Sequence, residues 1–187
     1  MKLWADLVAA TRTDDPFQGA ANRIAFFVGT SQPFYPLGLV WVMGEGGWAS
    51  SIAWVTTPIF LAVPFIGRVL PALSRVLVAL AGTFVTTMVA LRLGIDSFVE
   101  AYHLPVVLVG LLLFGCRDRW AQAIALALPV LGFALVHGAG PVPAVVEGAD
   151  KLQWLHGVGA LILSAYVIYE AWAARKQVVA TSRQASV

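Results

Sequence analysis

Long apolar runs constrain this chain more than any other feature of its sequence. Six of them follow one another, each close to the roughly 20 residues that a helix needs to cross a hydrocarbon layer about 30 Å thick. They cover residues 22–43, 48–70, 73–92, 97–115, 120–138 and 152–173. We therefore predict an all-α integral membrane protein, a bundle of six transmembrane helices that forms a single membrane domain over residues 1–187.

The composition excludes a water-facing surface for most of the chain. The 187 residues include 12 Lys and Arg, 10 Asp and Glu, and 59% hydrophobic residues, and the mean hydropathy is +0.81. Soluble domains usually carry about 25% charged residues, so lipid must be the solvent for much of this chain. The net charge of +2 is small, which gives no support to a nucleic-acid partner.

The positive charges predict how the chain is inserted. If both termini are cytoplasmic, the inner side holds Lys2, Arg12, Arg23, Arg68, Arg75, Arg117, Arg119, Arg175, Lys176 and Arg183, and the outer side holds Arg92 and Lys151. Cytoplasmic loops of membrane proteins carry the excess of Lys and Arg. We therefore expect a multi-pass protein of the cell inner (plasma) membrane with both termini in the cytoplasm.

The two ends of the chain differ from the spans. Residues 1–13 place their apolar side chains on one side of a helix, as in an amphipathic segment that lies on the membrane surface. Asp15 and Pro16 are typical of an N-cap and the first residue of a helix. The tail, 177–187, is polar and rich in small residues, so we expect it to be disordered.

Ionisable side chains near the outer ends of three predicted spans are the first candidates for a site. His103, His137 and His156 fall in the same leaflet. Asp96, Glu100 and His103 are spaced i, i+4, i+7, which places them on one stripe of the fourth predicted helix. Glu100-x-x-His103 has the spacing with which carboxylate-bridged metal bundles present their ligands. We expect a site with imidazole and carboxylate groups beneath the outer surface.

Several interpretations of this histidine cluster stay open. Three imidazoles with a carboxylate suit a transition metal such as zinc, copper or iron, and two imidazoles from different helices suit the iron of haem b. An imidazole beside carboxylates also changes charge near neutral pH, which favours a proton-responsive cluster. A purely structural alternative is that the histidines hydrogen-bond to carbonyl groups or water at the level of the lipid head groups.

A second polar region lies deeper in the membrane. Pro33 and Pro36 remove two backbone donors near the middle of the first predicted span, so the helix should kink or open there. Thr56, Thr57, Thr83, Thr86 and Thr87 lie at a similar depth in the second and third predicted spans. They either satisfy the freed carbonyl groups within a packed bundle or line a small cavity. In the second case Gln32, Tyr35, Thr56 and Thr86 would contact a small amphipathic ligand.

The order of landmarks resembles the six-span membrane-associated sensor regions, or MASE-type domains, that precede cyclase or histidine kinase modules in bacteria. The matching residues, within about 22–135, are Asn22-Arg23-Ile24, Tyr35-Pro36, Gly94 with Ser97, Leu104-Pro105, and Phe114 followed by Arg117 and Arg119. This resemblance implies a non-catalytic module that detects a small signal in or near the membrane as a homodimer. Only a short tail follows the sixth predicted span, so we expect either a lone sensor region or a protein that signals through a separate partner.

These observations favour a membrane sensory or ligand-binding protein without enzymatic chemistry of its own, whose partners are the lipid bilayer and its ligand. One alternative is a membrane haem or metal protein with a redox function, in which two of the three histidines are ligands. A further alternative is a small channel or transporter, against which the absence of an internal repeat and the scarcity of charge in mid-membrane argue.

Overall fold

The computed structural model of the chain describes residues 9, 11–114, 118–139 and 149–184. Every regular element within these ranges is helical. The elements are α2 (Pro16–Ser31), α3 (Phe34–Met43), η1 (Gly44–Ile52), α4 (Ala53–Ile66), α5 (Pro71–Leu93), η2 (Ile95–Ser97), η3 (Val99–Tyr102), α6 (His103–Leu112), α7 (Arg119–Gly138) and α8 (Ala149–Gln184), where η denotes a 3₁₀ helix. The all-α class predicted from the sequence is confirmed for this part of the chain.

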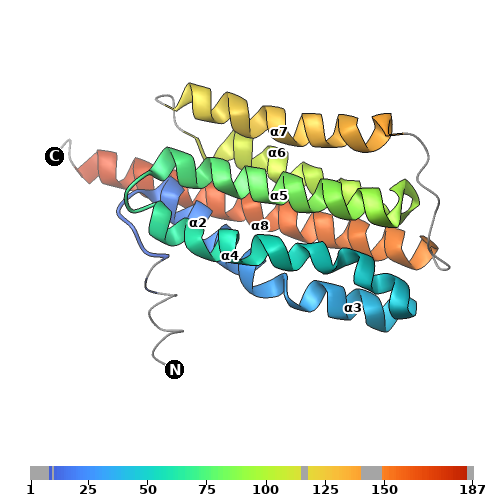
Figure 1. Cartoon of the computed structure of the whole chain (residues 1–187). Helices are drawn as coiled ribbons and strands as arrows, with labels where there is room; N and C mark the ends of the chain where they lie inside the picture. The colour runs from blue at the N-terminus through green and yellow to red at the C-terminus, as the bar shows by residue number, and fades with distance from the viewer. Residues whose placement is uncertain (1–8, 10, 115–117, 140–148, 185–187) are drawn as a thin grey trace.

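The helices run up and down the length of one elongated bundle (Figure 1). The pair α2 and α3 leads from one end of the bundle to the other, the chain turns back through η1 into α4, and α5, α6, α7 and α8 follow in alternating directions. As a result, α2 begins and α8 ends at the same end of the bundle.

Five elements form a closed ring, and α7 lies outside it. Contacts join α2 to α4, α4 to α5, α5 to α6, α6 to α8, and α8 back to α2. α7 packs on the outside against α5 and α6. Most of the surface of α7 is therefore apolar and exposed, with Trp120, Val130, Leu131 and Leu135 all more than half exposed.

Each passage of the chain along the bundle is called a leg here, and the first leg consists of α2 and α3 together. Local sequence signals explain where this first leg begins and where it is interrupted. Asp15 caps α2, since its Oδ1 accepts hydrogen bonds from the backbone N–H groups of Phe17 and Gln18, and Pro16 is the first helical residue. The helix then stops at Ser31 and resumes at Phe34. Pro33 cannot donate a backbone hydrogen bond, so the predicted interruption of the first span is confirmed.

Four helical segments are long and apolar enough to cross a membrane: Phe34–Ile66, Pro71–Leu93, Arg119–Gly138 and Lys151–Gln184. The first of these comprises α3, η1 and α4, and the chain reverses its direction within it. Val99–Leu112 is a shorter apolar helical stretch. These lengths and compositions are those of a membrane protein.

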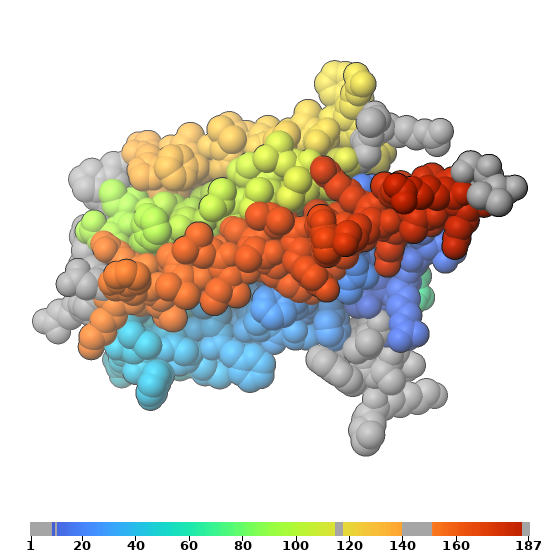
Figure 2. All heavy atoms as spheres, turned by 180° about the vertical axis from the view of Figure 1, so that it is seen from behind, coloured from blue at the N-terminus to red at the C-terminus, as the bar shows by residue number. Residues whose placement is uncertain are grey.

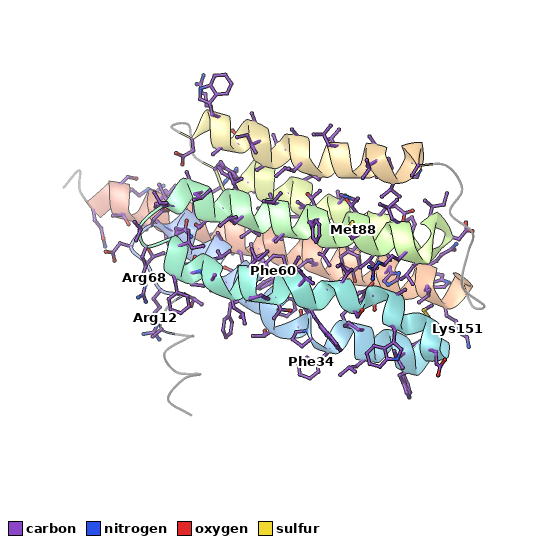
Figure 3. The ribbon with its side chains drawn as sticks, viewed as in Figure 1. Arg12, Phe34, Phe60, Arg68, Met88 and Lys151 are labelled. Carbon is purple, nitrogen blue, oxygen red and sulfur yellow. The ribbon has the colours of Figure 1, made fainter. Side chains whose placement is uncertain are left out.

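Charge separates the two ends of the bundle. The basic end, where α2 and α5 begin and α8 ends, holds Arg12, Arg23, Arg68, Arg75, Arg119, Arg175, Lys176 and Arg183. The opposite, acidic end holds Arg92 and Lys151 together with Glu45, Asp96 and Glu100. Figure 3 shows Arg12 and Arg68 at one end and Lys151 at the other. The grouping of charges that the sequence predicts is therefore present in the folded chain.

One expectation about the course of the chain differs from the structure, and another falls mostly outside the described residues. The tail was expected to be disordered over 177–187, but α8 continues to Gln184 with its last turns exposed. Extending an existing helix requires no new nucleation, so this segment continues α8 at little cost. Most of the predicted interfacial segment 1–13 and the last residues of the tail lie outside the described residues.

A candidate ligand cavity

The break between α2 and α3 turns polar side chains toward the interior. The carbonyl group of Pro33 accepts a hydrogen bond from Trp54 Nε1 at 3.1 Å. The side chains of Gln32 and Thr56 are hydrogen-bonded, with 2.7 Å between Oε1 and Oγ1. Both contacts come from α4, so the second leg of the bundle supplies the partners that the interrupted first leg needs.

Tyr35 and His156 meet across the ring, from α3 to α8. Tyr35 Oη lies 2.9 Å from Nε2 of His156, and the His156 side chain is fully buried. The other ring nitrogen, Nδ1, lies 2.7 Å from the carbonyl oxygen of Ser97. A carbonyl oxygen only accepts hydrogen bonds, so Nδ1 carries the proton, Nε2 accepts in the neutral ring, and the Tyr35 hydroxyl donates.

The Ser97 carbonyl group is itself held by the turn that follows α5. Gly94 ends α5 with φ of 86°, a conformation that favours glycine. Its carbonyl oxygen accepts hydrogen bonds from the backbone N–H of Ser97 at 3.1 Å and from Ser97 Oγ at 2.6 Å. The turn therefore fixes the acceptor that orients His156, and His156 orients Tyr35.

A cavity of about 310 Å³ lies inside the ring beside Tyr35. It is lined by Ile24, Phe27, Val28, Ser31, Gln32 and Tyr35 from the first leg, Phe60 from α4, Val78, Gly82, Val85, Thr86 and Val89 from α5, Val99 and Tyr102 from η3, Pro105, Val106 and Val109 from α6, and Gly159, Ile162, Leu163 and Val167 from α8. No residue of α7 contributes. Phe60 is 2% exposed, and Figure 3 shows it near the middle of the length of the bundle. The wall is mostly apolar with a few hydroxyl and amide groups, as in sites for small amphipathic molecules.

The four residues predicted to form a ligand pocket lie together. Gln32, Tyr35 and Thr86 line the cavity, and Thr56 contacts Gln32 from behind. His156, expected in a separate histidine site, belongs to the same region through its bond to Tyr35. The structure therefore brings the deep polar region and one of the three histidines into one arrangement.

Glu100, His103 and His137 form a different group on the other side of α6. Glu100 and His103 line a second hollow of about 300 Å³ between α6 and α7, together with Phe133. His103 Nδ1 lies 3.0 Å from the Glu100 carbonyl oxygen, and its Nε2 lies 3.2 Å from Thr87 Oγ1. The ring of His137 stacks near Phe133, with 4.3 Å between their centroids. The expected convergence of all three histidines does not occur, because His156 faces the ring interior, whereas His103 and His137 lie where α6 and α7 meet.

The expected stripe of Asp96, Glu100 and His103 on one helix is wrong. Asp96 belongs to η2 and Glu100 to η3, and Phe98 between them adopts the left-handed conformation with φ of 59°. α6 begins only at His103. Spacing by 3.6 residues per turn does not apply across such a break, so the three side chains do not share a helix face.

The hydrogen bonds of His103 and His156 leave neither imidazole with a ring nitrogen available to a metal ion. Both ring nitrogens of His103 and both of His156 are engaged in hydrogen bonds within the protein. Over the described ranges, no group of three or more His, Cys, Asp or Glu side chains could hold a metal ion. A haem or metal held by His103 or His156 would have to displace one of these hydrogen bonds.

Several residues that matter for the cavity were not singled out in the sequence. Tyr102 lines its polar end, and its ring also contacts that of His156 edge-on, with centroids 6.1 Å apart. Gly159 makes room for Tyr102, because a Cβ atom at Gly159 would overlap the hydroxyl oxygen of Tyr102. The local signal in the sequence is the small pair Gly159-Ala160, which begins three residues after His156.

Buried charges tie the basic end of the bundle together. Arg23 on α2 and Glu170 on α8 form an ion pair at 2.7 Å, and Glu170 is only 5% exposed. Arg75, also buried, pairs with Asp15 at 3.2 Å and donates to the Leu113 carbonyl oxygen at 2.8 Å. Two arginines that the sequence places on the cytoplasmic side therefore join separate helices beyond the apolar end of the cavity.

Comparisons with protein-family models, with curated proteins and with solved structures gave no match to this chain. The class of protein is therefore defined by the features of its described residues: a helical fold with four segments long and apolar enough to cross a membrane, and a ring of helices around an apolar cavity with one polar end.

Proposed function

We propose that this chain is a non-catalytic sensory or ligand-binding protein of the bacterial inner membrane. In this proposal the six legs of the bundle, from α2–α3 to α8, all cross the membrane. The basic end faces the cytoplasm, in agreement with the excess of Lys and Arg on that side. The ligand site is the cavity between the helices, with its polar end in the half of the bundle nearer the outer surface.

The observation that carries this proposal is the cavity beside Tyr35. Natural helix bundles are packed to high density, and voids larger than a water molecule are few. A cavity of about 310 Å³ within the ring is at the lower end of the range usual for small-molecule sites, about 300–1,000 Å³. It is bordered by segments from every leg except α7, so a bound molecule would contact most of the bundle at once.

This arrangement supports sensing as well as binding. The resemblance to MASE-type domains also favours a sensor, and three of its landmark residues, Ile24, Tyr35 and Pro105, line the cavity. A ligand that contacts α2, α5, α6 and α8 together would shift their relative positions if its affinity differs between two packings of the ring. The output would then pass to a homodimer partner or to a separate signalling protein through the cytoplasmic end.

The proposal is tested by asking whether the cavity is occupied when the protein is purified from its membrane. Native mass spectrometry of the full chain should show a bound small molecule that is lost in Val109→Phe, which fills the cavity, and kept in Val130→Phe on the exposed face of α7. An identical mass distribution for wild type and Val109→Phe would contradict the proposal. A Soret absorption band lost in His103→Ala or His156→Ala would instead establish the haem alternative.

A further inference from the structure

We infer that the cavity binds a single-chain lipid with an uncharged, hydrogen-bonding head group, held with its head toward the acidic end of the bundle. This inference rests on the proposed function and names the class of its ligand. It follows from the shape of the cavity, from the position of its polar atoms and from the place where the cavity opens.

The cavity is long and narrow. Its lining residues on α5 extend from Val78 to Val89, and a helical rise of 1.5 Å per residue makes this distance roughly 16 Å. Along that length, a volume of about 310 Å³ accommodates one extended hydrocarbon chain with a small head group.

Polar groups line only one end of this cavity. The end toward the basic side is bounded by Ile24, Val78, Val109 and Val167, whereas Gln32, Thr86 and Tyr102 lie at the other end with Tyr35. An apolar chain therefore fits the first end and a polar head group fits the second.

Three of these polar groups have hydrogen-bonding capacity to spare. Gln32 uses one atom of its side-chain amide on Thr56, and the other has no partner among the described residues. The hydroxyl groups of Thr86 and Tyr102 make no hydrogen bond to any other residue that the structure describes. Polar groups enclosed by apolar side chains rarely lack a hydrogen-bond partner, so a hydroxyl or carbonyl group of a ligand would satisfy this end of the cavity.

The head group is expected to carry no charge. Among the described lining residues there is no Asp, Glu, Lys, Arg or His. An ionised group in such a site would lose its hydration without gaining a counter-charge, which is far more costly than the burial of a neutral hydroxyl or carbonyl group. Phospholipids and ionised fatty acids are therefore disfavoured, and fatty alcohols and related neutral lipids are favoured.

The cavity opens sideways, toward the surface that faces lipid in the proposed orientation. Phe27 on α2 and Ile162 on α8 line it and are also 46% and 60% exposed. Figure 2 shows this side of the molecule, with α8 running along α2 and α3. A lipid in the bilayer would reach the cavity between these helices without passing through water.

Photo-crosslinking of the full chain in phosphatidylcholine nanodiscs tests this inference. The probes are two lauryl alcohols, one with a diazirine next to the hydroxyl group and one with a diazirine near the terminal methyl group. The head probe should label peptides that contain Thr86 or Tyr102, and the tail probe should label those that contain Val109 or Val167. Val109→Phe should reduce labelling about tenfold, corresponding to a loss of roughly 1.4 kcal/mol, and the matched variant Val130→Phe should leave it unchanged. If Val109→Phe fails to fold, Val78→Leu tests the same point.

Competition separates the ligand class from the function. Unlabelled lauryl alcohol should displace the probe, and laurate at neutral pH or a sterol should not. If laurate or the sterol competes better while Val109→Phe still abolishes labelling, the ligand class is wrong and the cavity remains a binding site. If Val109→Phe and Val78→Leu both fold and label like wild type, the cavity is not a site and the proposed function falls as well.

Discussion

Tyr35 donates a hydrogen bond to the fully buried imidazole of His156, and this contact joins residues that are 121 positions apart in the chain. It closes the ring of helices at the polar end of the cavity, where no other polar contact between α3 and α8 is present in the described part. Because Ser97 occupies the second ring nitrogen, the imidazole has one available orientation. The pair therefore sets the position of the Tyr35 ring that lines the cavity.

Tyr35→Phe should destabilise the protein. It leaves Nε2 of His156 buried without a donor, and an unsatisfied buried polar group costs about 1–3 kcal/mol. We expect a lower free energy of unfolding by this amount in detergent micelles, followed by circular dichroism. Tyr169→Phe, at an exposed tyrosine of α8, is the control and should unfold like wild type. In the double variant Tyr35→Phe/His156→Ala the two losses should not add, because the second removes the orphaned nitrogen.

The ion pair of Arg23 and Glu170 should respond asymmetrically to substitution. Arg23→Ala leaves a carboxylate that is 5% exposed without its partner, whereas Glu170→Ala leaves an arginine whose side chain is 39% exposed and can be hydrated. Breaking a buried pair costs roughly 3–5 kcal/mol, so Arg23→Ala should approach that range and Glu170→Ala should stay well below it. Equal losses in chemical unfolding would show that water reaches Glu170. Arg92→Ala is the control at an exposed position.

Glu100→Gln should stabilise the protein. Oε2 of Glu100 is buried without a hydrogen-bond partner within the described residues, and the residue is 9% exposed. Removing its charge should raise the free energy of unfolding by about 1 kcal/mol, since the amide is easier to bury than the carboxylate. Asp96→Asn, at an exposed carboxylate of the same segment, should have no effect. A loss of stability in Glu100→Gln would mean that this carboxylate binds a proton or a cation, as expected for a proton-responsive or metal-binding histidine cluster.

How far the sequence predicts this structure depends on how local each feature is. The cap at Asp15 and the break at Pro33 depend on the chemistry of neighbouring residues, and both were predictable. The meeting of Tyr35 with His156 depends on which helices are neighbours in the ring, and no spacing along the chain encodes that. The stripe from Asp96 to His103 failed for a third reason, since the left-handed Phe98 breaks a periodicity that is valid only within one helix.

The proposed orientation predicts which positions are accessible from each side of the membrane. In a Cys116→Ala background, single cysteines at Glu45 and Ala139 should react with a membrane-impermeant maleimide in intact spheroplasts. A cysteine at Arg183 should react only after lysis, because α8 ends at the basic end of the bundle. The inverse pattern would reverse the orientation. Labelling of both Glu45 and Arg183 positions in intact spheroplasts would show that the legs do not all cross.

The close approach of α7 to the ring gives the last prediction. A Cβ at Gly132 would lie 2.5 Å from Thr87 Oγ1 and 2.8 Å from His103 Nε2, the two atoms that are hydrogen-bonded to each other. Gly132→Ala must therefore push α7 outward or break that bond, and such overpacking typically costs about 1–3 kcal/mol. Gly138→Ala, in the last turn of the same helix, has nothing within 4 Å of the added methyl group. That variant should be neutral or slightly more stable, because alanine loses less backbone entropy in a helix. Thermal unfolding of the two variants side by side separates these effects, and an unaltered melting temperature for Gly132→Ala would mean that α7 is held only loosely against α5 and α6.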